Sequence, residues 1–282
     1  MHILKNLNIT SSDRISGFRP DIEGLRAVAV IFVLLYHISS DVLPGGFVGV
    51  DIFFVISGFL ITGLLVRELE RDSRISLLNF YARRAKRLLP AAGIILVVAA
   101  AISLIFLPVI DRSVFGYDII FSSVYLANWQ FAARNVDYLA EDISPSPVQH
   151  FWSLAVEEQY YIVWPILLVL VGWIVRRRKL SIRPVMAACL LTIALPSFAW
   201  SVYETANNQS AAFFVTATRM WELAVGAFIA VGSFLWIRIP KTWAIVLGWL
   251  GVTAVLASGV IFNELSAWPG YLAILPTLGT AA

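Results

Sequence analysis

The chain has 282 residues, of which 59% are hydrophobic and only 14% are charged, and its mean hydropathy is +0.81. A soluble domain of this size needs a larger charged surface, so the composition excludes that class and predicts an all-α polytopic membrane protein. A single cysteine excludes an intrachain disulfide, and no metal site is predicted. Cys189 lies in an apolar run, where packing is its expected role.

Apolar windows long enough to cross a bilayer follow one another along the chain. We expect seven spans, at residues 24–40, 47–66, 89–107, 151–175, 184–202, 211–235 and 242–262. A further window at 117–131 is shorter, contains Asp118 and Asn128, and precedes an acidic stretch. We interpret it as a re-entrant or interfacial segment on the outer side of a bundle of seven or eight transmembrane helices.

Positive charge sets the expected topology. Basic residues gather at 67–88 and 176–183, so the positive-inside rule places both loops in the cytoplasm. An even number of crossings must separate two cytoplasmic loops, which is why the 117–131 window is not counted as a span. The amino terminus falls inside by the same rule, and the first apolar run lacks the cleavage pattern of a signal peptide. The sequence thus predicts a multi-pass protein of the plasma (inner) membrane.

Two domains follow from this topology. Residues 1–18 are expected to form a cytoplasmic tail, and residues 19–282 a membrane domain. After Pro269 a new apolar run stops about thirteen residues later, short of a span, so we expect the domain to be incomplete at its carboxyl end.

The first span carries an arginine and a histidine, which are costly inside a membrane. Arg26 and His37 are eleven residues apart, so they share one helix face with about 16 Å of rise between them. This arrangement favours an enzyme that holds an anionic donor at one side and performs acid–base chemistry at the other. The alternative is a structural histidine with an arginine snorkelling to the interface.

The second span adds a carboxylate near its beginning. Asp51 could accept the second ring proton of His37 and fix its tautomer. The alternative is a helix-start group bonded to backbone amides. Ser57, Gly58 and Gly63 offer small surfaces, and close helix packing is their expected role.

Further ionisable residues lie in later spans. Glu157 and Glu158 are adjacent, so they point about 100° apart, and at least one should face a polar cavity. His150 precedes them and is only a weak catalytic candidate. Arg219 and Glu222 have the i, i+3 spacing of an intrahelical ion pair, which indicates a structural clamp or a substrate contact.

The segment RRAKR, with Arg83, Arg84 and Arg87, adjoins the inner end of the third span. Positive-inside bias and anionic lipid headgroups explain such a cluster by default. The sharper interpretation is a phosphate clamp, because a guanidinium can donate two hydrogen bonds to one phosphate group.

The chain resembles the membrane acyltransferase-3 family in five blocks of sequence. They are RPDIEGLRAVAVIFVLLYH, GGFVGVDIFFVISGFLIT, FYARRAKRLLPA, HFWSLAVEEQYYIVWP and TRMWELAVGA. The resemblance runs from about Arg19 to the last residue. It implies an integral membrane O-acyltransferase that takes acyl groups, often acetyl, from cytoplasmic acyl-coenzyme A and delivers them to cell-surface glycans. Among the family's functional residues, it matches Arg26, His37 and the Arg83, Arg84 and Arg87 motif.

The residues and the resemblance suggest one mechanism. The phosphates of acyl-coenzyme A, a substrate and not a resident cofactor, would bind Arg83, Arg84 and Arg87, and its pantetheine arm would pass Arg26 towards His37. His37 would act as general base on an acceptor hydroxyl, or be acylated itself, with Asp51, Glu157 or Glu158 orienting the ring. No serine or cysteine rivals it as nucleophile by sequence.

The expected partners are a glycan or lipid-linked glycan, such as O-antigen or exopolysaccharide, and membrane lipids, without nucleic acid. A proton-coupled exporter of lipid or sugar would also bury arginine, histidine and glutamate, although no repeated halves are visible. An inactive, truncated remnant is the other alternative.

Overall fold

The computed structural model describes residues 19–72, 74–139 and 146–282, so the expected tail at 1–18 lies outside the described residues. Every regular element in these ranges is helical. The elements are α2 (Pro20–Ile38), the 3-10 turn η1 (Gly46–Val48), α3 (Gly49–Asp72), α4 (Leu77–Phe106), α5 (Val109–Ser123), α6 (Ala127–Ala133), α7 (Phe151–Arg178), α8 (Ile182–Asn207), α9 (Gln209–Phe214), α10 (Thr216–Val231), α11 (Ser233–Trp236), α12 (Lys241–Ile261) and α13 (Ile274–Ala281).

Six helical segments of the described chain are long and apolar enough to cross a membrane, in agreement with a polytopic membrane protein. They are Gly46–Asp72, Leu77–Phe106, Phe151–Arg178, Ile182–Asn207, Gln209–Val231 and Lys241–Ile261. The expected first span is helical as α2, but it does not meet this criterion. The first two turns of this 19-residue helix contain three charged residues, which are Asp21, Glu23 and Arg26.

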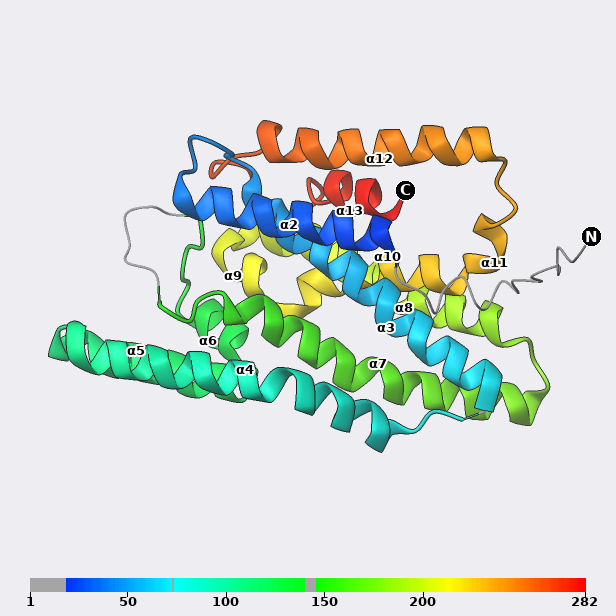
Figure 1. The fold of residues 1–282 in the computed structure, drawn as a ribbon, viewed down its shortest axis with the longest axis horizontal. Helices are drawn as coiled ribbons and strands as arrows, with labels where there is room; N and C mark the ends of the chain where they lie inside the picture. Colours follow the sequence, from blue (N-terminus) through cyan, green and yellow to red (C-terminus); the bar gives the residue numbers. More distant parts are fainter. Residues whose placement is uncertain (1–18, 73, 140–145) are drawn as a thin grey trace, which may run out of the picture.

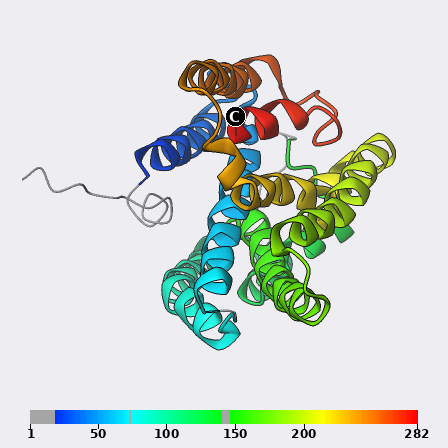
Figure 2. The ribbon, with the colours of Figure 1, turned by 90° about the vertical axis from the view of Figure 1, so that its right-hand side faces the viewer.

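The helices are arranged around α3 and α10, which lie in the middle of the bundle (Figures 1 and 2). On one side lie α2, α12 and α13, and on the other lie α4, α7 and α8. This arrangement surrounds the polar residues of α3 and α10 with protein, which is where a membrane protein can hold ionisable groups.

The window at 117–131 does not form one continuous helix. It is divided between α5 and α6, of 15 and 7 residues, which lie at the end of the bundle where α4 ends and α7 begins (Figure 1). Two of its buried polar residues have partners: Asp118 pairs with Arg134 at 2.7 Å, and Asn128 accepts a hydrogen bond from Gln159 at 2.9 Å. The interpretation that this segment does not cross agrees with the structure.

Two glycines let α3 and α10 approach closely. A Cβ atom at Gly58 would lie 1.9 Å from the carbonyl oxygen of Leu223, and one at Gly226 would lie 1.9 Å from that of Val55. Backbone at this distance leaves no room for a side chain, as in other membrane helix pairs built on small residues. The packing role expected for Gly58 is confirmed. Gly63 differs, because its nearest neighbour in the same test is 3.8 Å away.

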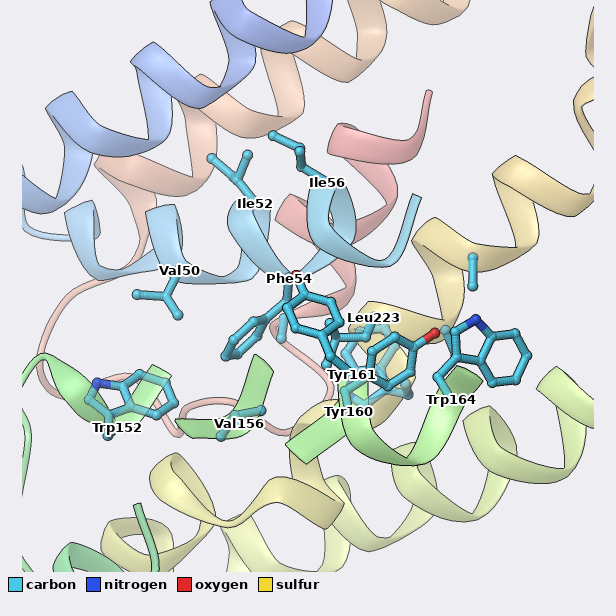
Figure 3. Packing of buried hydrophobic residues seen from close by; sticks show 14 of the residues in the cluster. Val50, Ile52, Phe54, Ile56, Trp152, Val156, Tyr160, Tyr161, Trp164 and Leu223 are labelled. Carbon is cyan, nitrogen blue, oxygen red and sulfur yellow. The ribbon is translucent and has the colours of Figure 1, made fainter. Parts of the chain in front are cut away.

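Large aromatic side chains fill the space between α3, α7 and α10. Figure 3 shows Phe54 of α3, Tyr160 and Trp164 of α7, and Leu223 of α10 in this layer. All four are buried, and the indole of Trp164 donates to Thr62 Oγ1 at 2.8 Å. This contact satisfies the polar atom of a large buried side chain, so α7 is held against α3 in a defined register.

Candidate functional site

His37 lies in the last turn of α2, at the end of the bundle that also contains the start of α7. Its Nδ1 is 2.7 Å from the carbonyl oxygen of Val33. A carbonyl only accepts hydrogen bonds, so Nδ1 carries the proton and Nε2 has the free lone pair. Nε2 is 3.3 Å from the hydroxyl of Tyr138, which donates to it. The ring is exposed, and both of its nitrogens have a partner that sets its orientation.

Tyr138, in the connection between α6 and α7, is held in place by aromatic rings. It stacks on Phe213 with centroids 4.4 Å apart and meets Trp152 edge to face at 5.9 Å. Burial raises the pKa of Tyr138 to about 12, so the phenol stays protonated at neutral pH and remains a hydrogen-bond donor. Sequence reasoning missed this residue, because nothing in the chain near Tyr138 points to a partner a hundred residues away.

Behind these rings lies a fully buried ion cluster. Arg219 Nη1 contacts Asp51 Oδ1 at 2.9 Å and Glu222 Oε1 at 3.1 Å, and its Nε donates to the carbonyl of Phe213. The guanidinium also lies 5.5 Å from the ring of Trp152. The predicted i, i+3 pair is present. The second carboxylate oxygens of Asp51 and Glu222 have no hydrogen-bond partner among the described residues.

This cluster corrects the expected role of Asp51. Its carboxylate binds Arg219 of α10, and the ring of His37 is oriented by Val33 and Tyr138 instead. Asp51 faces the centre of the bundle, where its charge neutralises Arg219. His37 lies at the exposed end of α2, so the two side chains do not meet. Asp51 therefore acts on the outer site only through Arg219 and its aromatic neighbours.

Glu157 and Glu158 do not orient His37 either. Glu157 accepts from Ser57 Oγ at 2.8 Å and from the hydroxyl of Tyr161 at 3.4 Å. Glu158 pairs with Arg84 at 2.6 Å. Both carboxylates lie two turns inside α7, where α3 and α4 are the adjacent helices. As expected from their spacing they point to different partners, and both partners are polar.

A large basic cavity lies at the opposite end of α3. It has a volume of about 770 Å³ and is formed by the end of α3, the start of α4 and the segment between them. Its charged lining comprises Arg67, Glu68, Arg71, Asp72, Arg74 and Arg83. Four guanidinium groups against two carboxylates make it suited to a phosphorylated ligand. Of the three arginines expected to form a phosphate clamp, Arg83 lines this cavity, whereas its described lining does not include Arg84 or Arg87.

Of the remaining predicted residues, Arg26 and Arg84 pair with carboxylates and do not line the cavity, whereas His150 lies near His37. Arg26 pairs with Glu23 of its own helix at 3.1 Å and is partly exposed. Arg84 is occupied by Glu158, and its guanidinium lies 3.6 Å from the ring centre of Tyr161. His150 adjoins α7, and burial, followed by the nearby ring of His37, lowers its pKa. His150 therefore belongs to the outer end, close to His37.

The two ends are far apart. Arg67 and Gly49 are eighteen residues apart on α3, and Gly49 packs against the carbonyl of Ala29 in α2. His37 follows Ala29 by eight residues on α2. At about 1.5 Å per residue the path from the cavity to the histidine is about 39 Å, more than the thickness of a bilayer's hydrocarbon core. The cavity and His37 thus lie at opposite ends of the bundle.

Comparisons with known proteins identify the family of the chain. The profile of a family described as an acyltransferase domain matches residues 19–282. Peptidoglycan O-acetyltransferase OatA of Listeria monocytogenes is 40% identical over 218 residues, which is 77% of this chain and 34% of that protein. O-acetyltransferase OatA of Staphylococcus aureus is 36% identical over 219 residues, 78% of this chain and 35% of that protein.

The chain spans about a third of the length of these relatives. No solved structure matches it significantly. The family match covers the first described helix through the last, including His37, the arginine-rich cavity and the buried Arg219 cluster. The chain therefore belongs to the membrane acyltransferase-3 family.

Proposed function

We propose that this chain is the membrane part of an O-acetyltransferase, which takes an acetyl group from cytoplasmic acetyl-coenzyme A and delivers it to a glycan hydroxyl on the outer side. The names of the relatives support acetyl transfer, and one of them is named for peptidoglycan. Peptidoglycan is accordingly the acceptor we favour over O-antigen or exopolysaccharide.

The observation that carries the proposal is the tautomer of His37. Because Nδ1 donates to Val33, Nε2 presents its lone pair beyond the end of α2, where a base for an external hydroxyl is required. The hydroxyl of Tyr138 occupies this position at 3.3 Å. An acceptor hydroxyl would take its place at Nε2, lose its proton to the ring, and attack the acyl carbonyl.

The basic cavity supplies the donor site. The phosphates of acetyl-coenzyme A would bind the guanidinium groups of Arg67, Arg71, Arg74 and Arg83, which line one cavity. Positive residues of this loop also favour the cytoplasmic side, where that donor is found. Transfer directly to the acceptor or through an acyl-histidine would both use Nε2.

The test supplies radiolabelled acetyl-coenzyme A to inside-out membrane vesicles that contain the protein and a glycan acceptor. We expect His37→Ala to abolish label transfer, and Arg83→Ala to raise the KM for the donor. Arg178→Ala is the matched control, because Arg178 belongs to the other basic loop and does not line the cavity. Unchanged transfer in His37→Ala would refute the role of His37, and glycan flux without coenzyme A would favour an exporter.

A further inference from the structure

A serine and a carboxylate form a direct pair inside the bundle, away from both sites. Ser57 Oγ donates to Glu157 Oε1 over 2.8 Å and connects α3 to α7. Both residues are partly exposed, although the carboxyl group of Glu157 points into the protein. A hydroxyl within hydrogen-bond reach of a carboxylate is the arrangement of a nucleophile and its general base. Packing alone, the role expected for Ser57, does not account for this contact.

Arg84 adds an unused donor to the same cluster. Its Nη2 binds Glu158 at 2.6 Å, and its guanidinium lies over Tyr161, whose hydroxyl donates to the second oxygen of Glu157. The Nε atom of Arg84 is buried, and it has no hydrogen-bond partner among the described residues. Leaving a buried charged donor unpaired is costly. Tyr161 thus connects this N–H group to Glu157, and a free N–H in such a cluster is suited to binding the oxyanion of a tetrahedral intermediate.

The position of Ser57 matches the reach of the proposed donor. Leu64, Glu68 and Arg71 of the basic cavity follow Ser57 by seven, eleven and fourteen residues, so they share its face of α3. Arg67 is ten residues from Ser57, which corresponds to about 15 Å. A pantetheine arm has about twelve bonds between its phosphate and its sulfur, and it spans about 15 Å when extended.

The same arm cannot reach the outer histidine. A donor with its phosphates at Arg67 would have to cover the path of about 39 Å to His37. Its thioester therefore ends near the middle of the bundle, at the level of Ser57. The first acyl transfer needs an acceptor at that level.

We propose that Ser57 is this first acceptor and that it carries the acyl group as a serine ester. The inference rests on the proposed function only in taking an acyl-coenzyme A thioester as the donor. Ser57 Oγ attacks the thioester carbonyl carbon while Glu157 takes the hydroxyl proton, and Arg84 Nε–H binds the oxyanion. The C–S bond then breaks, and the leaving thiolate receives the proton from Glu157. The products are acyl-Ser57 and free coenzyme A.

The second half of the reaction restores the pair. Because the path from Ser57 to His37 along α3 and α2 is about 24 Å, we include in the proposal a carrier alcohol that takes the group onward. Its hydroxyl attacks the ester carbonyl, the bond to Ser57 Oγ breaks, and the hydroxyl proton passes through Glu157 to Oγ. Ser57 and His37 thus act on different transfers. In the serine ester, the acyl group is bonded to the protein and coenzyme A has been released.

The test traps the ester by leaving out the glycan. Inside-out vesicles containing the protein are incubated with radiolabelled acetyl-coenzyme A, digested, and analysed by mass spectrometry for one hydroxylamine-labile acetyl group on the peptide with Ser57. We expect labelling of the unmodified protein and a loss of at least about 100-fold in Ser57→Ala and Glu157→Gln. Ser57→Cys keeps a nucleophile and should be labelled. Ser103→Ala is the control, because this buried serine of α4 has no hydrogen-bond partner among the described residues.

The outcomes separate this inference from the proposed function. His37→Ala should keep the label on Ser57 and lose transfer to glycan. Transfer to glycan at the normal rate in Ser57→Ala, or an unlabelled Ser57 in protein that transfers acetyl, would overturn the inference and leave the proposed function standing. Labelled Ser57 together with normal glycan transfer in His37→Ala would instead refute the outer base alone. Loss of label in Ser57→Cys as well as in Ser57→Ala counts against the inference.

Discussion

Arg219 of α10 and Asp51 of α3 form an ion pair at 2.9 Å in the centre of the bundle, although 168 residues separate them in the chain. Glu222 binds the same guanidinium from the next turn of α10. Two carboxylates for one cation mean that the two acidic partners are not equivalent: Asp51 joins two helices, whereas Glu222 belongs to the same helix as the arginine.

We therefore expect Asp51→Leu to destabilise the protein more than Glu222→Gln. Either variant leaves one carboxylate on Arg219, so both losses should stay below the about 3–5 kcal/mol of an uncompensated buried charge. Asp51→Leu also removes the bond between α3 and α10, whereas Glu222→Gln leaves it in place. Thermal unfolding of the detergent-solubilised protein measures both. Equal decreases in unfolding temperature would show that the pair between α3 and α10 contributes no more stability than the pair within α10.

The hydrogen bond from Tyr138 to His37 predicts a specific kinetic effect. Tyr138→Phe keeps the stacking on Phe213 and removes only the hydroxyl, which the acceptor must displace from Nε2 of His37. A hydrogen bond of about 1 to 1.5 kcal/mol corresponds to about a tenfold lower KM for the acceptor. The KM for the donor should not change, because the cavity is distant. Tyr203→Phe, an exposed position on α8, is the control, and a Tyr138→Phe enzyme with an unchanged KM for the acceptor would contradict this role.

Glycines of α3 provide a matched pair of packing variants. Gly58→Ala places a Cβ where the carbonyl of Leu223 already lies, so α3 and α10 must separate. Overpacking of this kind costs about 1–3 kcal/mol. A Cβ at Gly63 would make ordinary van der Waals contacts, 3.8 Å from Arg67 and 3.9 Å from Ala230, so Gly63→Ala should be neutral or slightly stabilising, because alanine favours helix. Unfolding temperatures compare the two, and similar values would mean that the close approach at Gly58 is not required.

His150 predicts a pH dependence of stability. Burial and the nearby ring of His37 lower its pKa below the ordinary 6.5, so the folded state binds this proton less readily than the unfolded state. The contribution to stability is complete above pH 6.5 and is lost as the pH falls through the lowered pKa. His150→Gln should flatten this part of the curve of unfolding temperature against pH. A curve with the same slope in the variant would assign the effect to another group.

Only some of the contacts around His37 and Arg219 join residues that are close in sequence. The contact of His37 with Val33 spans four residues of one helix, and the pair of Arg219 with Glu222 spans three. Helical periodicity alone predicts such neighbours. Tyr138, in contrast, reaches His37 from 101 residues away, and the choice between Asp51 and Tyr138 as its partner depends on how α2 and α3 are turned.

Helices and their approximate limits follow from local rules, because an apolar run of sufficient length must satisfy its backbone internally in a membrane. The partners of Asp51, Ser57, Glu157 and Arg84 do not follow from them. Each was decided by helix rotation and by close approach at glycines, which set the side chains that meet across α3, α4, α7 and α10. A buried charge must find an opposite charge wherever packing places one, so ion pairing in this bundle is a property of the tertiary structure.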